Sequence, residues 1–223
     1  MPVAIITGGA AGIGRHLCAG FAREGYVVAA LDIQPMSSPH PDIHCFPCDL
    51  RDEAAITSVF HTIAQTLGTP RVLINNGAVS RFRKPFPLLE AREFDDVLGT
   101  NLRGAFLCCR EFVRLCRGTG YGRIINIASL QSSRAFPNGL PYGASKGGIA
   151  QLTRGMAEAW SRPGTGITAN AIAPGFFKTQ LTAPLFDRPE VVEALARQTT
   201  MKRVGFAEDI QGLTMFLASP ASD

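Results

Sequence analysis

Short runs of apolar residues alternate with longer segments of mixed polarity along the whole chain. The runs are rich in Val, Ile and Ala, which is typical of strands buried on both faces of a parallel sheet. They lie at residues 3–6, 26–31, 43–46, 71–74, 122–129 and 166–173. Strands separated by helices predict an α/β fold, a doubly wound parallel β-sheet with helices on both faces.

The segments between these runs carry apolar residues three and four positions apart, which predicts helices. These helices are expected at residues 52–67, 91–117 and 207–217, and in the segment that follows Tyr142. Residues 176–200 differ, because they mix phenylalanines with prolines and polar residues. That composition is expected of a mobile flap over an apolar pocket.

A glycine-rich turn joins the first strand to the first helix, over residues 7–14. Such a turn brings backbone N–H groups and the positive end of a helix to a phosphate. Asp32 ends the second strand 18 residues after Gly14, where a carboxylate accepts hydrogen bonds from an adenosine ribose and repels a 2′-phosphate. The context therefore predicts a dinucleotide site. A plain polar strand end is the less favoured alternative for Asp32.

Tyr142 and Lys146 lie four residues apart in the segment Tyr-Gly-Ala-Ser-Lys. On a helix, such positions share one face. A free phenol has a pKa of about 10, and a cation about 4 Å away at an effective dielectric of about 20 favours the phenolate by roughly 4 kcal/mol. That brings the phenol near the pH at which a general acid or base works best. The same pair also occurs by chance on solvated helices.

Composition limits the remaining classes of function. The chain has 223 residues, of which 46% are hydrophobic and 18% charged, which fits one compact domain. The net charge of +4 comes without a run of five like charges, so no nucleic-acid surface is expected. No apolar run approaches the length of a transmembrane helix, and residues 1–6 lack a basic region typical of a signal peptide. We therefore expect a soluble, cytoplasmic protein without a membrane partner.

Six cysteines raise the question of metal or redox chemistry. Cys45 and Cys48 have the spacing of a redox pair or half of a zinc site, but no second pair follows at ligand spacing. Reduced, mostly buried thiols are the simpler interpretation. No metal site is expected.

In this order the motifs closely resemble those of the short-chain dehydrogenase/reductase family, in its single-domain branch. The resemblance covers nearly the whole chain. The motifs are the loop of residues 7–14, Asp32, Asp49-Leu50, Asn75-Asn76, Asn101, Ser129, Tyr142 with Lys146, and Pro174-Gly175 with Thr179. The resemblance implies one NAD(P)-binding Rossmann-fold domain over residues 1–223 that transfers a hydride between a nicotinamide cofactor and a secondary alcohol or ketone.

The resemblance also implies roles for particular residues. Tyr142 resembles the general acid–base group, and Lys146 lowers the pKa of Tyr142 and holds the nicotinamide ribose. Ser129 orients the substrate oxygen, and Asn101 holds a water that links Lys146 to solvent. The residues expected to contact the cofactor are Gly8, Gly12, Ile13, Gly14, Asp32, Asp49, Leu50, Asn76, Gly77, Tyr142, Lys146, Pro174, Gly175 and Thr179.

Two features depart from the family pattern. The family's usual Asn-Asn-Ala-Gly is here Asn-Asn-Gly-Ala, so that Gly77 and Ala78 stand in exchanged order. Because alanine cannot replace glycine at positive φ, we expect the backbone beside the nicotinamide to shift. Relatives also continue beyond the position of Ser219 into one more strand. We therefore expect the sixth strand to be a bare edge, with reduced stability or altered assembly that melting and light scattering would test.

The sequence leaves alternatives both for the cofactor and for the function. Neither the glycine loop nor Ile33 offers a cation, although Arg15 follows the loop, so Asp32 predicts NAD rather than NADP. A catalytically silent dinucleotide-binding or scaffold protein of the same fold is the alternative to an enzyme. A methyltransferase also uses a glycine loop and an acidic strand end, but it gives Tyr142 and Lys146 no task.

The substrate is left open among polyols, sugars, 3-oxoacyl thioesters and hydroxysteroids. Phe136 and the phenylalanines of the flap indicate an apolar wall. Arg81, Arg83, Lys84 and Lys178 are candidates for an anionic group, with solvated surface charge as the simpler explanation. We expect a small-molecule alcohol or ketone as substrate and a homodimer or homotetramer as the assembly.

Overall fold

Six parallel strands form one sheet in the order β3-β2-β1-β4-β5-β6. The computed structural model describes residues 1–37, 40–80, 84–179 and 182–223. The strands are β1 Val3–Thr7, β2 Val27–Asp32, β3 Ile43–Pro47, β4 Pro70–Asn75, β5 Gly122–Ile127 and β6 Ile167–Ile172. The chain changes its direction of winding between β1 and β4, so the topological switch point, where ligands bind in such sheets, lies there. The predicted doubly wound fold is confirmed.

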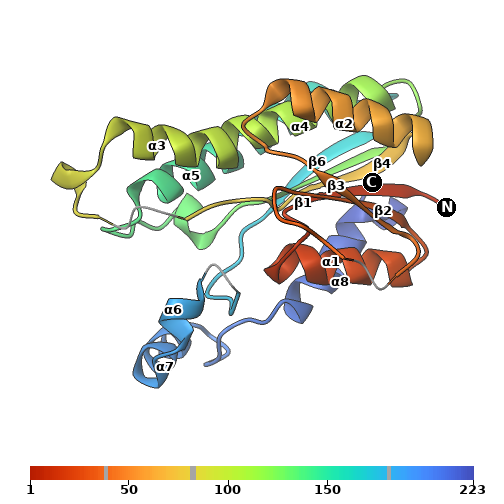
Figure 1. Cartoon of the computed structure of the whole chain (residues 1–223). Helices are drawn as coiled ribbons and strands as arrows, with labels where there is room; N and C mark the ends of the chain where they lie inside the picture. The colour runs from red at the N-terminus through yellow and green to blue at the C-terminus, as the bar shows by residue number, and fades with distance from the viewer. Residues whose placement is uncertain (38–39, 81–83, 180–181) are drawn as a thin grey trace.

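Helices cover both faces of this sheet (Figure 1). α1 and α8 pack together on one face, whereas α2, α4 and α5 cover the other. The helices are α1 Gly12–Arg23, α2 Glu53–Thr66, α3 Ala91–Leu98, α4 Ala105–Cys116, α5 Leu140–Trp160, α6 Ala183–Phe186, α7 Pro189–Arg197 and α8 Glu208–Ala218. Short 3₁₀ turns, η1 Phe86–Leu88, η3 Leu130–Ser132 and η5 Pro220–Ser222, lie between them or follow them.

Strand β1 divides its side chains between two cores. Val3 and Ile5 lie in the core beneath α2 and α4, and Ala4 and Ile6 lie in the core beneath α1 and α8. Because successive strand residues point to opposite faces, a strand covered on both sides is apolar at every position. The unbroken apolar run at the start of the chain is thus explained.

The single helix expected at residues 91–117 is interrupted. Residues Gly99–Gly104 form a π-helical turn, η2, between α3 and α4. A Cβ at Gly104 would lie 2.6 Å from the carbonyl oxygen of Leu50, so the helix meets the loop after β3 where only glycine fits. A π turn inserts an extra residue into an α-helix and is frequent at functional sites. The apolar stripe resumes after it, which is why periodicity alone did not indicate it.

The expected flap contains two helices, α6 and α7. They stand apart from the sheet, at the end of the molecule opposite both chain termini (Figure 1). An isolated parallel bridge between Phe177 and Gly205 ties the two ends of this segment together. Gln180 and Leu181, within the expected flap, lie outside the described residues.

Strand β5 carries a buried arginine, Arg123, near its start. The guanidinium donates to the main-chain carbonyls of Gly166 and Ser219 and forms an ion pair with Asp223. It also lies over the Tyr121 ring, 4.0 Å from the ring centre. These contacts fasten residues 219–223 to strand β5.

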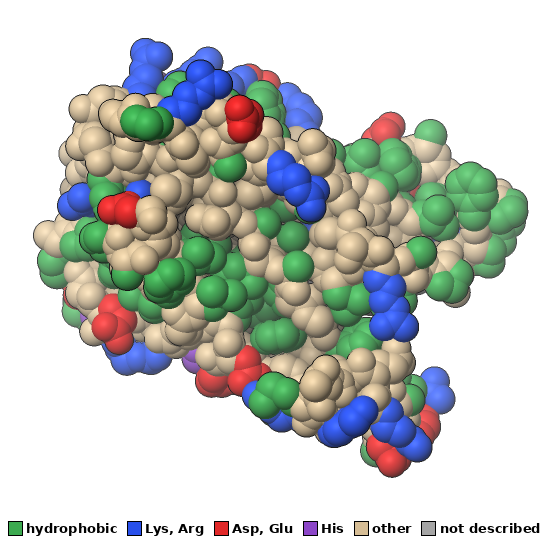
Figure 2. Space-filling view, turned by 180° about the vertical axis from the view of Figure 1, so that it is seen from behind, with side chains coloured by type: hydrophobic (Ala, Val, Ile, Leu, Met, Phe, Trp, Pro, Cys, Tyr) green, Lys and Arg blue, Asp and Glu red, His purple; other side chains and the backbone are tan. Residues whose placement is uncertain are grey.

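The sheet edges and the surface are as follows. β6 lies at one edge of the described sheet. In the face seen in Figure 2, Lys and Arg side chains occur at separate places with acidic and apolar side chains between them. Among the described residues, no helix has the length and apolar character needed to cross a membrane.

Candidate active site

A cleft of about 460 Å³ opens where the strands end. Each strand contributes to its lining: Gly8 follows β1, Asp32 ends β2, Asp49 follows β3, Asn76 follows β4, Ser129 follows β5 and Pro174 follows β6. The sequence-predicted site residues in the lining are Gly8, Gly12, Ile13, Asp32, Asp49, Leu50, Asn76, Gly77, Ser129, Tyr142, Lys146, Pro174, Gly175 and Thr179. Two predicted residues, Gly14 and Asn101, lie outside the lining.

The glycine turn has the geometry of a phosphate cradle. Gly8 and Gly12 both have positive φ, 68° and 54°, which an L side chain rarely adopts. Helix α1 starts at Gly12 without a side-chain cap and without an acidic residue in its first turn, so its N–H groups remain available to an anion. Gly14 serves packing instead, because a Cβ there would lie 2.0 Å from the Gly8 carbonyl oxygen.

The Asp32 carboxylate is held in place at the end of β2. Its Oδ2 accepts a hydrogen bond from the Ala10 N–H at 3.0 Å, and its Oδ1 accepts one from the Gln34 N–H at 3.0 Å. These bonds join the carboxylate to the glycine turn. A ribose and a pyrophosphate of one dinucleotide would therefore meet a single preformed surface, and the residues present fit such a cofactor.

The segment after β4 packs tightly against the glycine turn. Thr7 Oγ1 accepts hydrogen bonds from the N–H groups of Asn76 at 3.1 Å and Gly77 at 2.9 Å. A Cβ on Gly77 would lie 2.8 Å from Leu50 Cδ1 and 3.2 Å from the Gly8 nitrogen, so glycine fits this close approach without a shift of its neighbours.

The exchanged order of Gly77 and Ala78 does not strain the backbone. Within the described part of the chain, Lys202 is the one non-glycine residue with φ in the left-handed region. Ala78 therefore does not adopt the left-handed conformation that would strain alanine, and the expected shift of the backbone relative to the family stays a prediction. The glycine of this motif is required by its neighbours rather than by its own dihedral angles.

Three charged residues gather where the cleft meets the loop after β3. The Arg51 guanidinium bonds both oxygens of Asp49, at 2.7–3.2 Å, and one oxygen of Asp96 at 2.7 Å. All three residues line the cleft. The hydrogen bonds from Arg51 hold the pKa of the Asp49 carboxyl below its ordinary value. The sequence singled out Asp49 but gave no signal for Arg51 or Asp96, which lie 45 residues apart.

Ser129 and Tyr142 face the same cleft from different elements. Ser129 ends the stretch after β5 and caps η3, where its Oγ accepts a hydrogen bond from the Gln131 N–H at 3.1 Å. Tyr142 lies in the first turn of α5. The structure therefore brings together a hydroxyl and a phenol that are 13 residues apart in the sequence.

Lys146 lies one turn after Tyr142 and is 3% exposed. Its Nζ is 5.7 Å from the centre of the Tyr142 ring and donates to the Ile127 carbonyl oxygen at 2.5 Å. Burial lowers the pKa of Lys146 to about 8, because a low-dielectric surrounding disfavours the ammonium. The predicted i, i+4 face is confirmed, and its cation is bonded to the strand behind it.

Asn101 lies buried in the π turn η2. Its Oδ1 accepts a hydrogen bond from the Val79 N–H at 2.8 Å, and its Nδ2 donates to the Val79 carbonyl at 2.9 Å and to Ser145 Oγ at 3.1 Å. Both amide hydrogens are therefore used within the protein. Asn101 connects a cleft-lining residue, Val79, to the helix that carries Tyr142 and Lys146.

A chain of buried polar side chains behind the cleft was not predicted. Asn75 Nδ2 donates to Asn126 Oδ1 at 2.8 Å, and Asn126 Nδ2 donates to Thr153 Oγ1 at 2.9 Å. Asn75 and Asn126 are register partners in β4 and β5, and Thr153 lies on α5. An Asn inside each of two apolar strands was the available signal, because a buried amide needs a polar partner.

The cysteines and the candidate cations at residues 81–84 give weaker support for a site. All six cysteines are free, and burial raises the pKa of the cleft-lining Cys48 thiol to about 11. The described residues contain no group of three His, Cys, Asp or Glu side chains placed to hold a metal. Arg81 and Arg83 lie outside the described residues, and Lys84 is paired with Glu93.

The geometry resembles that of known oxidoreductases. A family model described as Enoyl-(Acyl carrier protein) reductase matches residues 8–223. Gluconate 5-dehydrogenase of Gluconobacter oxydans is 33% identical over 228 residues, which cover 98% of this chain and 88% of that protein. The 5-keto-D-gluconate 5-reductase of Escherichia coli K12 is 32% identical, with 98% and 89% covered.

A solved structure shows the same architecture. The crystal structure of a gluconate 5-dehydrogenase from Burkholderia cenocepacia, in complex with NADP and tartrate, superimposes with a TM-score of 0.90. The two chains are 30% identical, and the match covers 99% of this chain and 89% of the other. Fold, cleft and sequence thus agree on one kind of chemistry.

Proposed function

The chain belongs to the short-chain dehydrogenase/reductase family, and on this premise we propose that Tyr142, Ser129 and Lys146 carry its reaction. The protein is an oxidoreductase that acts on a secondary alcohol or ketone with a nicotinamide cofactor. When bound, the nicotinamide gives or takes the hydride at the carbinol carbon. The chain itself must position the substrate oxygen and move its proton.

Tyr142 is the proton carrier in this proposal. Its phenol gives a proton to the ketone oxygen, or takes one from the alcohol, and Ser129 donates a hydrogen bond to the same oxygen as negative charge develops on it. Lys146 favours the phenolate through its charge. The observation that carries the proposal is the meeting of these three side chains at one cleft, with Lys146 buried beneath the phenol.

Asn101 acts in a different way from the three cleft residues. Its amide hydrogens are taken up by Val79 and Ser145, so its side chain has no hydrogen left to donate to a water. We propose that Asn101 positions the cleft wall and α5 relative to each other. A relay water, as implied by the family, would have to donate to Asn101 Oδ1 or bond main-chain groups of η2.

The test of the catalytic roles is the variant Tyr142→Phe. It should abolish turnover while the NADH dissociation constant, measured by fluorescence titration, stays close to that of the wild type. Retained turnover would remove Tyr142 from its role. Loss of NADH binding together with turnover would instead indicate a damaged fold. A wild type that binds NADH but turns over no alcohol or ketone would favour the silent dinucleotide-binding protein.

NAD is the proposed cofactor. Asp32 stands where the adenosine ribose would bind, and the described cleft lining holds only two cations, Arg51 and Lys146. Arg51 is already paired with two carboxylates. A 2′-phosphate would thus meet mainly negative charge. The Burkholderia protein holds NADP. Measuring kcat/KM with NAD and with NADP therefore decides which cofactor this protein prefers. Asp32→Ala should shift the ratio of the two kcat/KM values toward NADP.

The proposed substrate is a polyhydroxylated acid or polyol with a secondary alcohol, because the relatives named above act on gluconate or its 5-keto form. Residues 176–200 are the proposed flap over it. Phe136 and Phe176 meet edge to face, 6.4 Å between ring centres, and supply an apolar wall. A panel of gluconate, 5-keto-gluconate, galactitol and 2-butanol separates this class from simple alcohols.

A homodimer or homotetramer in the cytoplasm completes the proposal. Phe106 on α4 and Leu213 and Phe216 on α8 are 46–48% exposed, and six free thiols suit a reducing compartment. Light scattering measures the assembly directly. A monomer at micromolar concentration would contradict it.

A further inference from the structure

Arg51 contacts both helix α3 and the π turn η2 that follows it. Its Nη1 bonds Asp96 Oδ1 at 2.7 Å, on α3 before the turn. Its main-chain carbonyl accepts a hydrogen bond from Arg103 Nη1 at 3.1 Å, within the turn. Thr100 Oγ1 in turn donates to the Asp96 carbonyl at 3.1 Å. One residue of the loop after β3 thus connects to the helix before η2 and to η2 itself.

The same residue forms part of the cleft. Arg51 lines it together with Asp49, Asp96 and Thr100, and its guanidinium bonds Asp49 through three donor contacts. The cleft wall that would hold the adenine is therefore joined directly to the π turn.

On its other side the π turn reaches the catalytic helix. Asn101 bonds the main chain of Val79, a cleft residue, and the side chain of Ser145. Ser145 Oγ donates to the Tyr142 carbonyl at 2.7 Å and directly precedes Lys146. A displacement of η2 would therefore move Tyr142 and Lys146 relative to the cleft wall.

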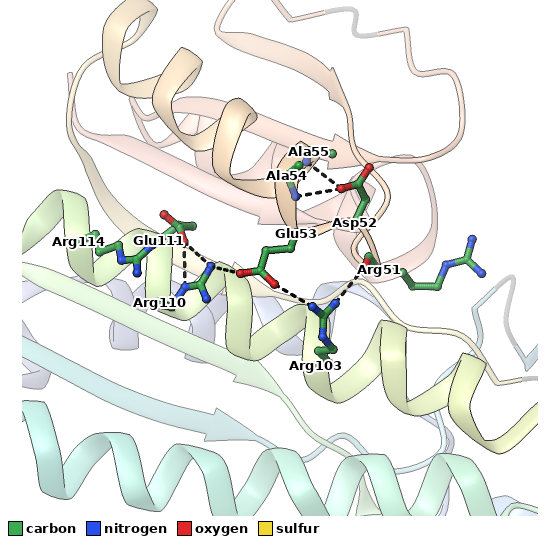
Figure 3. Close-up of polar contacts among 9 residues, drawn as sticks. All are labelled: Arg51, Asp52, Glu53, Ala54, Ala55, Arg103, Arg110, Glu111 and Arg114. Atoms are coloured by element: carbon green, nitrogen blue, oxygen red, sulfur yellow. Dashed lines mark hydrogen bonds and ion pairs between the residues drawn. The ribbon is translucent and has the colours of Figure 1, made fainter. Parts of the chain in front are cut away.

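Arg103 is supported by further charges on α2 and α4. Figure 3 shows Glu53 between Arg103 and Arg110, with Arg103 continuing to the main chain of Arg51. Arg110 and Arg114 then share Glu111. Arg103 does not line the cleft. Its side chain bonds only the Arg51 carbonyl and Glu53 among the described residues.

We propose that Arg51 and Arg103 are positioning residues for hydride and proton transfer: they hold the π turn so that Asn101 sets the place of Tyr142 and Lys146. This inference rests on the proposed function. Its physical basis is a series of contacts: Arg51 bonds Asp49 and Asp96, the Asp96 carbonyl accepts from Thr100, and the next residue of the chain, Asn101, bonds Ser145. Small errors in the placement of reacting groups lower the rate of the chemical step more than they weaken binding.

The contacts are strong enough to matter as a group. Arg51 and Arg103 are each about half exposed, and an isolated exposed ion pair contributes little. Here, however, Arg51 joins Asp49 through several contacts and also bonds Asp96, and Arg103 shares Glu53 with Arg110. Networks and multiple-contact pairs are the cases in which exposed charges contribute measurably.

The test compares Arg51→Met, Arg103→Met and a matched control, Arg114→Met. Arg114 lies on α4, as Arg110 does, and pairs with Glu111, but it makes no contact with η2 among the described residues. With saturating NAD and gluconate, or the best substrate of the alcohol panel, kcat should fall about fivefold or more in Arg51→Met and Arg103→Met. KM for NAD should rise in Arg51→Met alone, because only Arg51 lines the cleft. Arg114→Met should keep wild-type values.

A second measurement needs no substrate. Hydrogen exchange of peptides covering residues 99–104 and 142–146 should be faster in Arg51→Met and Arg103→Met than in Arg114→Met, both without and with NADH. The primary isotope effect of an alcohol deuterated at its carbinol carbon should rise in the first two variants, as expected when the hydride step is slowed.

Several results would overturn the inference. A rise of KM for NAD with unchanged kcat would make Arg51 an adenine-binding residue only. Equal losses in Arg114→Met would indicate a general weakening of α4. Unchanged exchange at 99–104 would separate Arg51 from the π turn. None of these results affects the role of Tyr142, which the Tyr142→Phe variant tests separately.

Discussion

Lys146 Nζ donates to the main-chain carbonyl of Ile127 at 2.5 Å. Ile127 ends strand β5, two residues before Ser129, so the cation of the helix is bonded to the strand that delivers the hydroxyl. The ammonium is almost completely buried, and burial lowers its pKa to about 8. The protein therefore keeps, at its proposed catalytic centre, a charge that opposes folding.

Replacing Lys146 by Met should raise stability relative to the wild type most strongly at neutral pH. Because the pKa of Lys146 falls from 10.5 to about 8 on folding, the cost of burying its charge is fully present below pH 8. This cost is lost as the pH rises from about 8 to 10.5. A shift of this size corresponds to about 3 kcal/mol, less the lost hydrogen bond to Ile127. Urea unfolding at about pH 6.5 and about pH 9.5 measures the difference.

The control for this prediction is Lys178→Met, because Lys178 is exposed. Its effect on the free energy of unfolding should be the same at both pH values. A Lys146→Met effect that does not change between the two pH values would mean that the ammonium is better solvated than its burial indicates.

Ketone reduction should lose efficiency as the pH rises through about 8. The reaction needs the protonated phenol of Tyr142 and the charged form of Lys146, whose folded pKa is about 8. kcat/KM for the ketone, which reports the free enzyme, should therefore fall above this pH. The kcat/KM of Ser129→Ala should fall at the same pH from a lower plateau. A wild-type kcat/KM that stays constant up to pH 10 would contradict the roles assigned to Tyr142 and Lys146.

Gly14→Ala should damage the glycine turn even though Gly14 does not line the cleft. The new Cβ would lie 2.0 Å from the Gly8 carbonyl oxygen, and overpacking of this kind costs about 1–3 kcal/mol. We expect a lower free energy of unfolding and weaker NADH binding by fluorescence titration.

The matched variant is Ala78→Gly, which restores a glycine at the usual family position. Because the φ of Ala78 is not positive, it should leave the NADH dissociation constant unchanged and cost no more than about 1 kcal/mol of stability. A large gain in NADH affinity would show that the exchanged order does disturb the cofactor site.

Thr153→Val tests whether the buried hydrogen bonds behind the cleft contribute to stability. The substitution keeps the shape but leaves Asn126 Nδ2 without its acceptor inside the core, which costs about 1–3 kcal/mol. Thr62→Val on the exposed face of α2 should change stability by less than about 0.5 kcal/mol. Urea unfolding compares the two; equal effects would place a partner for Asn126 elsewhere.

Much of the cleft could be predicted because its chemistry lies at strand ends. In a parallel sheet these ends gather at one edge, so Asp32, Ser129 and Asn76 were placed together by the order of strands alone. Tyr142 and Lys146 followed from helical spacing. These are local patterns whose spatial meaning depends only on the fold class.

The parts that could not be predicted depend on contacts between distant segments. Gly14 and Gly77 are both required for close packing, and composition does not distinguish this use of glycine from approach to a ligand. The π turn adds a residue to a helix, and apolar spacing alone does not indicate it. Arg51 bonds Asp96, which lies 45 residues later in the sequence, and neither local sequence indicates this pair.

The contacts of Arg123 bear on how the protein is made. This side chain lies in an interior strand, β5, yet Gly166, Ser219 and Asp223, which it bonds, are up to 100 residues later in the chain. During synthesis, β5 leaves the ribosome long before these groups exist, and a buried guanidinium without partners is costly. Closure of the sheet around β5 is therefore expected only after residues 219–223 have been made, and nascent chains stalled before residue 219 should remain open to proteases at β5.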